Sequence, residues 1–454
     1  MSPIDAHALC GILGARLAAG DGAVRFSGSV CTDTRSLGDG CLFVALKGER
    51  FDGNSFAAQA LTDGAAIVIV SEWRGEAPIG TAVLVVPDTL HALQQLAAWW
   101  RGQLDIPVVA ITGSNGKTST KDFTAAVLGM RFAVSATKGN LNNHIGVPIT
   151  VLATETSHGA GVWEMGMNHA GEIAPLCEIA KPKFSIITNI GTAHIEFLGT
   201  QDAIAAEKGE VARCLPSDGT LIVPADCRYL DLFRSMSAAD IVTTGGESSP
   251  VRAENVVVKD RSAAFDLVID GEETVRVELP VSGRHMVANA LLAAALGWKL
   301  GLSSGEIATG LSGAKLTGGR LGSHDCNGVT VIDDTYNANP ESMAAAIETL
   351  AEQPLKNGAR RFIVLGRMGE LGPHAEQAHR RVGALAAEKG LTVLAVGEGA
   401  ELIGEAAGAP FFPDFESAAN WLKAAAKEDD VVLFKGSRTA TIERVMHAAF
   451  PKHS

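Results

Sequence analysis

The stretch that decides the fold reads VVAITGSNGKTST and covers residues 108 to 120. Its first five residues are typical of a buried strand, a glycine loop follows, and Lys117-Thr118 open a segment typical of a helix. In such a loop the backbone N–H groups face phosphate, the lysine neutralises the β and γ phosphates, and the hydroxyl ligates Mg²⁺. The alternative is a tight glycine turn with an incidental lysine. We predict an ATP site made by Gly113, Ser114, Asn115, Gly116, Lys117, Thr118 and Ser119.

Around this loop, strands and helices alternate as they do in a parallel α/β sheet. We predict a central domain over residues 106–314, with strands at 108–112, 162–165, 184–189 and 220–223. Helices are expected at 119–128, 172–180, 202–214, 285–300 and 304–311. Between about 250 and 280 the apolar residues recur with period two, which predicts a small antiparallel set attached to the sheet.

The flanking regions predict two further α/β domains. Residues 1–105 contain short strand-like runs at 24–27, 42–46, 65–70 and 82–86, and a helix over 87–104 whose cap is Asp88-Thr89. The Gly-rich segment 313–320 indicates a hinge. Residues 315–454 then alternate again in the manner of a Rossmann-like domain, with strands at 329–333, 362–365, 393–396 and 431–434 and helices at 343–351, 377–388, 417–427 and 441–450.

Composition excludes several classes of protein. The 454 residues are 46% hydrophobic, enough for several cores, and the formal charge of -13 leaves no excess of cations for a nucleic-acid track. No apolar run reaches the roughly 18 residues of a membrane span, and no secretory signal is visible at the N-terminus. The seven cysteines are scattered, as is usual in a reducing cytosol. We therefore expect a cytoplasmic protein without a membrane span or a nucleic-acid partner.

Two further residues predict a metal site beside the loop. Glu164 ends an apolar strand, where a carboxylate is costly unless it meets a cation, and His194 follows the strand at 184–189. Ligand sites of parallel sheets collect at the carboxyl ends of the strands. Taken singly, either residue reads as a capping or loop residue. Together with Thr118 they favour Mg²⁺ coordination.

The loop is the compact G-x-x-G-K-[ST] form preceded by Thr112, and this form resembles the Mur ligase superfamily, the ATP-dependent amide-bond ligases of peptidoglycan synthesis and their folylpolyglutamate synthetase relatives. The resemblance implies two Mg²⁺ sites, and a catalytic role for Lys208, in AAEKGEVA, as a carbamate. It also implies that Asn289 contacts adenine, that Arg320 reaches the nucleotide and that Asp334 binds ribose. Many relatives have asparagine at the position of Met286.

Further motifs indicate a branch of this superfamily: CTDTRSLGDGCLFVALKGERFDGNSF (31–56), TKGNLNNHIGVP (137–148), DDTYNANPESM (333–343), LGRMGELG (365–372) and FKGSR (434–438). The resemblance implies a UDP-sugar-binding first domain and transfer of D-alanyl-D-alanine to UDP-N-acetylmuramoyl-tripeptide through an acyl phosphate. A monomer would suffice for this reaction. The substrate-binding residues expected are Thr34, Arg35, Asn140, Asn142, Asn337, Asn339, Lys435 and Arg438.

Three alternatives remain at this point. The first is another ligase of the superfamily, against which the third-domain motifs speak, because no Asp-Asn-Pro-Arg motif of the diaminopimelate-adding ligase is present. The second is a phosphate-loop switch or transport ATPase, which would turn over ATP without an amino-acid acceptor. The third is a nucleotide-binding protein without catalysis, which the joint presence of Lys117, Thr118, Glu164 and His194 disfavours.

Overall fold

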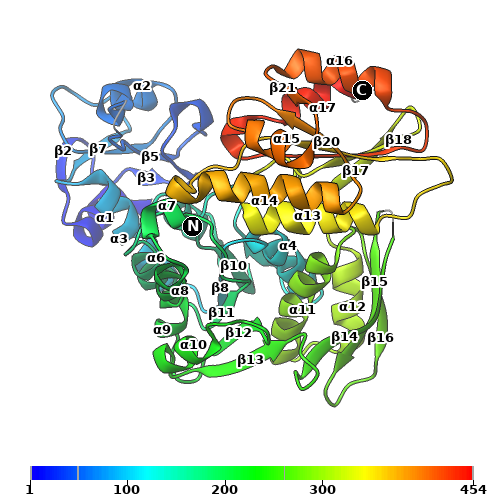
Figure 1. Cartoon of the computed structure of the whole chain (residues 1–454). Helices are drawn as coiled ribbons and strands as arrows, with labels where there is room; N and C mark the ends of the chain where they lie inside the picture. Colours follow the sequence, from blue (N-terminus) through cyan, green and yellow to red (C-terminus); the bar gives the residue numbers. More distant parts are fainter. Residues whose placement is uncertain (1–2, 49–50, 260, 452–454) are drawn as a thin grey trace.

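The computed structural model describes residues 3–48, 51–259 and 261–451, and its three larger β-sheets are each packed against helices (Figure 1). The central sheet has nine strands in the order β16-β15-β14-β13-β12-β11-β8-β10-β9. Strands β8 to β14 pair in parallel, and β14, β15 and β16 continue the same sheet in antiparallel pairing. The bounds are β8 Val108–Thr112, β9 Val134–Ala136, β10 Ala160–Glu164, β11 Phe184–Ile187, β12 Thr220–Pro224, β13 Asp240–Thr244, β14 Val251–Val258, β15 Ala263–Ile269 and β16 Val275–Leu279.

Strand β8 lies inside this sheet, between β10 and β11, and all five of its residues are buried. A parallel strand covered on both faces reads as a continuous apolar run, which explains why its sequence does not alternate. The helices of this unit are α4 Lys117–Leu128, α5 Gly146–Leu152, α6 Ile173–Ala180, α7 Ile195–Leu198, α8 Gln201–Lys208, α9 Glu210–Arg213, α10 Leu230–Met236, α11 Arg284–Lys299 and α12 Ser304–Ser312. The predicted antiparallel set is confirmed as part of the same sheet.

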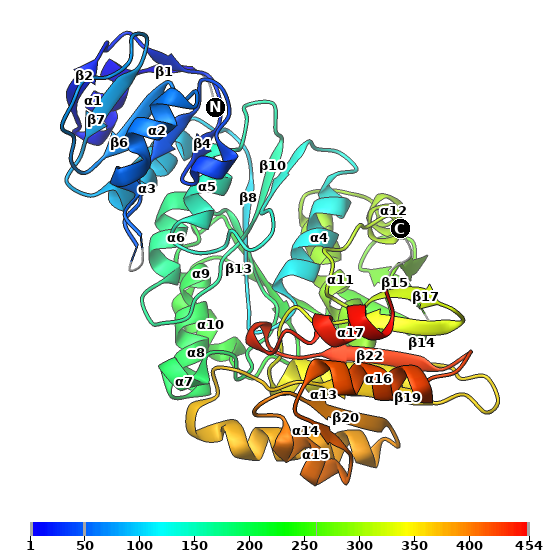
Figure 2. The same ribbon diagram turned by 90° about the horizontal axis from the view of Figure 1, so that it is seen from above.

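The third sheet has six strands in the order β17-β18-β22-β19-β20-β21, parallel except for the β17-β18 pair. Its strands are β17 Gly322–Cys326, β18 Val329–Asp333, β19 Arg361–Leu365, β20 Thr392–Val396, β21 Phe411–Phe412 and β22 Val431–Lys435. Its helices are α13 Pro340–Glu352, α14 Ala375–Glu388, α15 Glu401–Ala407, α16 Phe415–Ala425 and α17 Glu443–Ala449. Figure 2 shows this unit, in orange and red, against the central one.

The N-terminal sheet has five strands in the order β2-β7-β6-β5-β4, of which only the β2-β7 pair is antiparallel. The elements are α1 Ala6–Leu13, β2 Arg16–Gly20, β4 Val30–Cys31, β5 Leu42–Val44, α2 Ala57–Thr62, β6 Ile67–Val70, β7 Ala82–Val85 and α3 Thr89–Arg101. The Asp88 side chain caps α3 by accepting from the N–H groups of Leu90 and His91. The indole of Trp100 donates to the Thr154 carbonyl (2.8 Å), which ties α3 to the central unit.

The three-unit α/β fold is therefore confirmed, and among the local differences from prediction two concern predicted elements that form differently. The run at 24–27 forms β3 Arg25–Phe26, which pairs with β1 Ile4–Asp5 instead of joining the five-stranded sheet. The predicted helix at 202–214 is two helices, α8 and α9, that meet at Gly209. The domain boundaries at 105/106 and 314/315 stay a prediction. Within the described residues, no helix combines the length and apolar character that crossing a bilayer requires.

Candidate active site

The phosphate loop, residues 112–118, joins β8 to α4 and depends on two glycines with positive φ. Gly113 has a φ of 147° and Gly116, which caps α4, has a φ of 78°. A Cβ atom on Gly113 would lie 1.8 Å from the Thr188 hydroxyl, so no larger residue fits there. The Lys117 ammonium donates to the Gly113 carbonyl (2.8 Å) and so folds back over the loop. The predicted strand, loop and helix are thus all present.

The loop is held in place by the segment that follows β11. The N–H of Asn115 donates to the Asn189 side chain (2.9 Å), and the Thr188 hydroxyl donates to the Asn115 carbonyl (2.5 Å). The N–H of Gly191 donates to the Ser114 hydroxyl (2.8 Å). These bonds join residues more than 70 positions apart, because β11 lies next to β8 in the sheet.

Glu164 and Thr118, two of the predicted metal ligands, are in direct contact. The Thr118 hydroxyl donates to one carboxylate oxygen of Glu164 (2.8 Å), and the Asn142 amide donates to the other (2.8 Å). The contact forms because Glu164, the last residue of β10, lies in register with Ile111 of β8. Glu164 is only 3% exposed and forms no ion pair within the described residues. Asn142, predicted to present the muramoyl peptide, here supports this carboxylate.

Lys208 lies at the end of α8 and is fully buried, whereas its sequence context alone resembles a solvated helix lysine. Its ammonium nitrogen has no hydrogen-bond partner in the described part of the chain. Burial, reinforced by the charge of Lys117, holds the pKa of Lys208 well below its ordinary value. The neighbouring Glu207 accepts three backbone N–H bonds, from Gly171, Glu172 and Ile173. A buried amine favoured in its neutral form is a nucleophile.

His194, the third predicted metal ligand, lies beside a carboxylate from the third unit. Its Nδ1 atom is 2.6 Å from Glu370 Oε2, and its backbone has a φ of 66°. This imidazole holds the pKa of Glu370 below its usual range. Burial lowers the pKa of Lys117, while the charges of Glu164 and Glu370 partly offset that effect. Charged groups from two units therefore converge on the phosphate loop.

Two of the residues predicted to hold the rest of the nucleotide, Asn289 and Arg320, lie near the same loop. Asn289 on α11 lies so close to Gly116 that a Cβ there would be 2.6 Å from its amide oxygen. The Asn289 amide contacts Met286 Sδ at 3.8 Å, so this methionine lies directly against the predicted adenine contact. The Arg320 guanidinium stacks over Tyr336 at 4.1 Å, and among the described residues its Nε has no partner.

Asp334 and Lys435 form a buried ion pair of 2.6 Å at the carboxyl ends of β18 and β22. Lys435 Nζ also donates to the Asn337 carbonyl (3.0 Å), so the cation predicted to hold a dipeptide carboxylate is already engaged here. Burial raises the pKa of Asp334, against the effect of Lys435. Arg438 is exposed, and its guanidinium reaches Glu443 at 3.2 Å. Contacts of either cation with a dipeptide stay a prediction.

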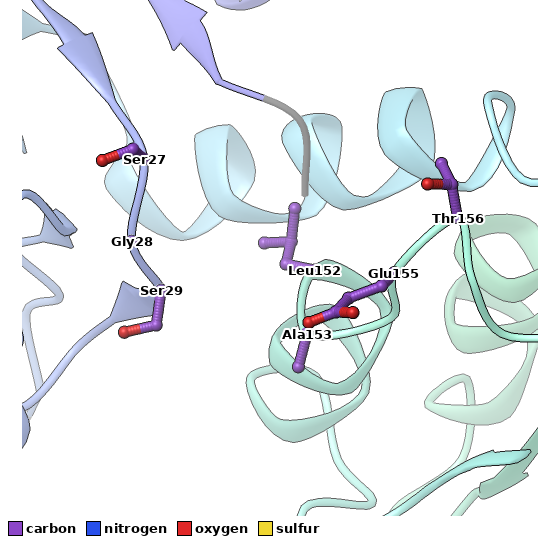
Figure 3. A pocket seen from close by; sticks show the side chains of 7 residues that line it. All are labelled: Ser27, Gly28, Ser29, Leu152, Ala153, Glu155 and Thr156. Atoms are coloured by element: carbon purple, nitrogen blue, oxygen red, sulfur yellow. The ribbon is translucent and has the colours of Figure 1, made fainter. Parts of the chain in front are cut away.

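The predicted substrate residues of the other units lie on exposed segments. Thr34 and Arg35 belong to a 3-10 turn, Thr34–Ser36, capped by Asp33, and the Arg35 guanidinium pairs with the Asp33 carboxylate. That contact lowers the pKa of Asp33 to about 2. Asn140 is exposed on the loop that carries Asn142. A cavity of about 420 Å³ (Figure 3) lies between Ser27–Ser29 and the end of α5, lined also by Glu155, and no predicted site residue lines it.

Sequence reasoning missed three residues of this region. Glu370 contacts His194, Glu341 contacts the loop after β11, and His285 at the start of α11 lies near Lys435. Burial and the charge of Lys435 lower the pKa of His285 to about 4. A usable signal existed for Glu370 and Glu341, because Glu370 lies in the motif LGRMGELG (365–372) and Glu341 in the motif DDTYNANPESM (333–343).

The fold and this loop define a phosphate-loop protein in which side chains of two α/β units meet beside the loop. Three family descriptions match the chain in order: "Mur ligase family, catalytic domain" over residues 28–101, "Mur ligase middle domain" over 111–297 and "Mur ligase, glutamate ligase domain" over 319–438. The chain belongs to the Mur ligase family.

Individual relatives are similar over nearly the whole chain. The UDP-N-acetylmuramoyl-tripeptide–D-alanyl-D-alanine ligase of Escherichia coli (strain K12) is 40% identical over 428 residues, 92% of this chain and 93% of that protein. A crystal structure of MurF from Acinetobacter baumannii superposes with a TM-score of 0.90 at 34% identity, covering 99% of both chains. MurF of Thermotoga maritima in complex with ADP has a TM-score of 0.84 at 28% identity, covering 93% of this chain and 97% of that one.

Proposed function

We propose that this chain is an ATP-dependent ligase that joins D-alanyl-D-alanine to UDP-N-acetylmuramoyl-tripeptide. One observation carries the proposal: Lys117 and the Thr118–Glu164 contact stand together at the carboxyl edge of the central sheet. The chain that holds them is similar over nearly its whole length to ligases of that name, one of them solved with ADP. We further propose that the reaction takes place in the cytoplasm and that the active protein is a monomer.

The reaction proceeds in two transfers. A carboxylate oxygen of the tripeptide attacks the γ-phosphorus, the bond to the ADP oxygen breaks, and an acyl phosphate forms. The dipeptide amine then attacks the acyl carbon, loses a proton, and expels inorganic phosphate as the amide forms. Such transfers depend on positioning and charge neutralisation. Lys117 is the cation of the loop, and the Gly113 to Thr118 backbone would orient the phosphates.

The residues around Thr118 fit Mg²⁺. Glu164 is a buried carboxylate without an ion-pair partner in the described residues, and its oxygens accept only from a hydroxyl and an amide. Such a group is costly to bury unless it meets a cation. Among the described residues no three His, Cys, Asp or Glu side chains form a ready metal cluster, so phosphate oxygens would complete the coordination. Thr118, Glu164 and His194 would hold the ions, which neutralise phosphate charge when bound.

Lys208 fits the carbamate that the family resemblance implies. Carbamate formation requires a neutral amine, and burial favours that form of Lys208. The Lys208 nitrogen has no hydrogen-bond partner among the described residues, so no hydrogen bond has to break before it reacts with CO₂. Lys208 would then present a negative group near Lys117, whose charge already acts on it.

The nucleotide and substrates would lie between the units. Asn289 beside the phosphate loop would contact adenine, Asp334 the ribose, and Arg320, whose Nε has no partner within the described residues, the phosphates. The UDP-sugar would lie along the first unit at Thr34 and Arg35, and Asn140 would meet the muramoyl peptide. Asn337, Asn339, Lys435 and Arg438 would face the dipeptide side.

The test measures phosphate release over a matrix of UDP-muramoyl peptides and D-amino-acid acceptors, with mass analysis of the product. Release that requires both UDP-N-acetylmuramoyl-tripeptide and D-alanyl-D-alanine supports the proposal. Acceptor-independent turnover would instead indicate an ATPase. The variant Lys117→Ala should form no product while keeping the circular dichroism of the parent, and full activity in it would overturn the role given to the loop.

A further inference from the structure

Two side chains at the start of α13, in the third unit, form hydrogen bonds with the central unit. The Glu341 carboxylate accepts from the N–H of Thr192 (3.0 Å) and from the Thr192 hydroxyl (3.1 Å). The Asn339 amide donates to the side-chain oxygen of Asn115 (2.7 Å), while its own oxygen caps α13. One helical turn therefore makes three hydrogen bonds across the boundary between the two units.

Both partners of this turn belong to the loops that form the candidate active site. Asn115 is in the phosphate loop, and Thr192 lies two residues before His194. Gly191, next to Thr192, donates its N–H to the Ser114 hydroxyl (2.8 Å). Glu341 is thus connected through Thr192 and Gly191 to the phosphate loop.

The contact is closely fitted. A Cβ atom on Gly191 would lie 2.9 Å from the Glu341 carboxyl carbon, so a larger residue at position 191 would displace this carboxylate. The carboxylate accepts one bond through each oxygen, from two donors of the same residue. Such paired, charge-assisted bonds fix an orientation as well as a distance.

We propose that Glu341 is a positioning residue of the ligase reaction: by holding Thr192 when the third unit is closed, it aligns the 190–194 segment with the phosphate loop. This inference rests on the proposed function. Closure of the third unit would then have two effects. It would cover the nucleotide, and the Glu341 carboxylate would orient the segment that leads to His194. A variant without this carboxylate would still bind ATP in the central unit, but its third unit would close less completely over the nucleotide.

The variant Glu341→Gln tests this directly. It keeps the shape of the side chain but replaces one acceptor oxygen with an NH₂ group, which would face a donor of Thr192. Product formation in the full chain should fall at least tenfold in kcat, with the stoichiometry of ATP-analogue binding unchanged at one per chain. X-ray scattering should show less compaction with that analogue and the UDP-substrate than the parent shows. Parent-like kcat and compaction would overturn the proposal.

A double-variant cycle separates positioning from a general structural effect. Thr192→Val removes the hydroxyl bond, and in the Glu341→Gln background it should add less than a threefold further loss. Independent, multiplicative losses would count against the coupling. The control is Glu348→Gln on the same helix, whose partner Lys389 belongs to the third unit (2.9 Å), and it should keep parent activity and compaction. If the parent itself forms no amide product, the proposed function fails; if the parent is active and Glu341→Gln matches it, only the positioning role fails.

Discussion

Replacing Asp334 with asparagine should locally destabilise the third unit by removing one charge of a buried pair. The Asp334–Lys435 contact is 2.6 Å long, and the two side chains are 15% and 4% exposed. Solvent therefore screens the remaining Lys435 ammonium little. Leaving one partner of a buried pair uncompensated costs about 3–5 kcal/mol. Against a stability of about 5–15 kcal/mol for a domain, that is a large share.

Hydrogen exchange measured by mass spectrometry suits this prediction, because the chain has three units and global unfolding would not be two-state. The amides of β18 and β22 should exchange about 10²–10⁴ times faster in Asp334→Asn, since each 1.4 kcal/mol is a factor of ten. The double variant Asp334→Asn with Lys435→Met removes the orphaned charge and should recover most of the protection. A change below tenfold in the single variant would refute the uncompensated-charge argument.

Three further predictions concern Lys208, Thr118 and His285. Lys208→Met removes an amine without a partner among the described residues, so the free energy of local opening of α8 should rise by about 1–3 kcal/mol while amide product disappears; faster hydrogen exchange of the α8 amides than in the parent would contradict this. Thr118→Val should lower kcat at least tenfold, whereas Thr118→Ser, which keeps the hydroxyl facing Glu164, should stay within a few-fold in the phosphate-release assay. The pKa of His285 is lowered to about 4, so the unfolded chain binds more protons between pH 6.5 and 4 and the local stability of α11 falls as pH falls there. His285→Gln should flatten that slope in hydrogen exchange of the α11 amides, after correction for the intrinsic pH dependence of exchange, and an unchanged slope would contradict this.

Much of the secondary structure could be predicted because it depends on short-range patterns. The apolar runs at 108–112 and 329–333 coincide with β8 and β18, and the Asp88 cap marks the start of α3. The run at 24–27 shows the limit of such patterns. Its residues favour a strand, but its partner is β1, and pairing between distant segments is decided by which surfaces can be buried together.

For the candidate site, the sequence by itself determined the phosphate loop, because the two glycines with positive φ, Gly113 and Gly116, and the Lys117 and Thr118 side chains lie within six consecutive residues. Only the tertiary structure decided what surrounds that loop. Parallel register brings Glu164 to Thr118 across 46 residues, and packing buries Lys208 although its helix segment reads as solvated. The contacts of Glu341 and Glu370 join residues of two units that lie more than 140 positions apart in the sequence. Local conformation is set by neighbours in the chain, whereas burial and charge at a site are set by whatever the fold packs against it.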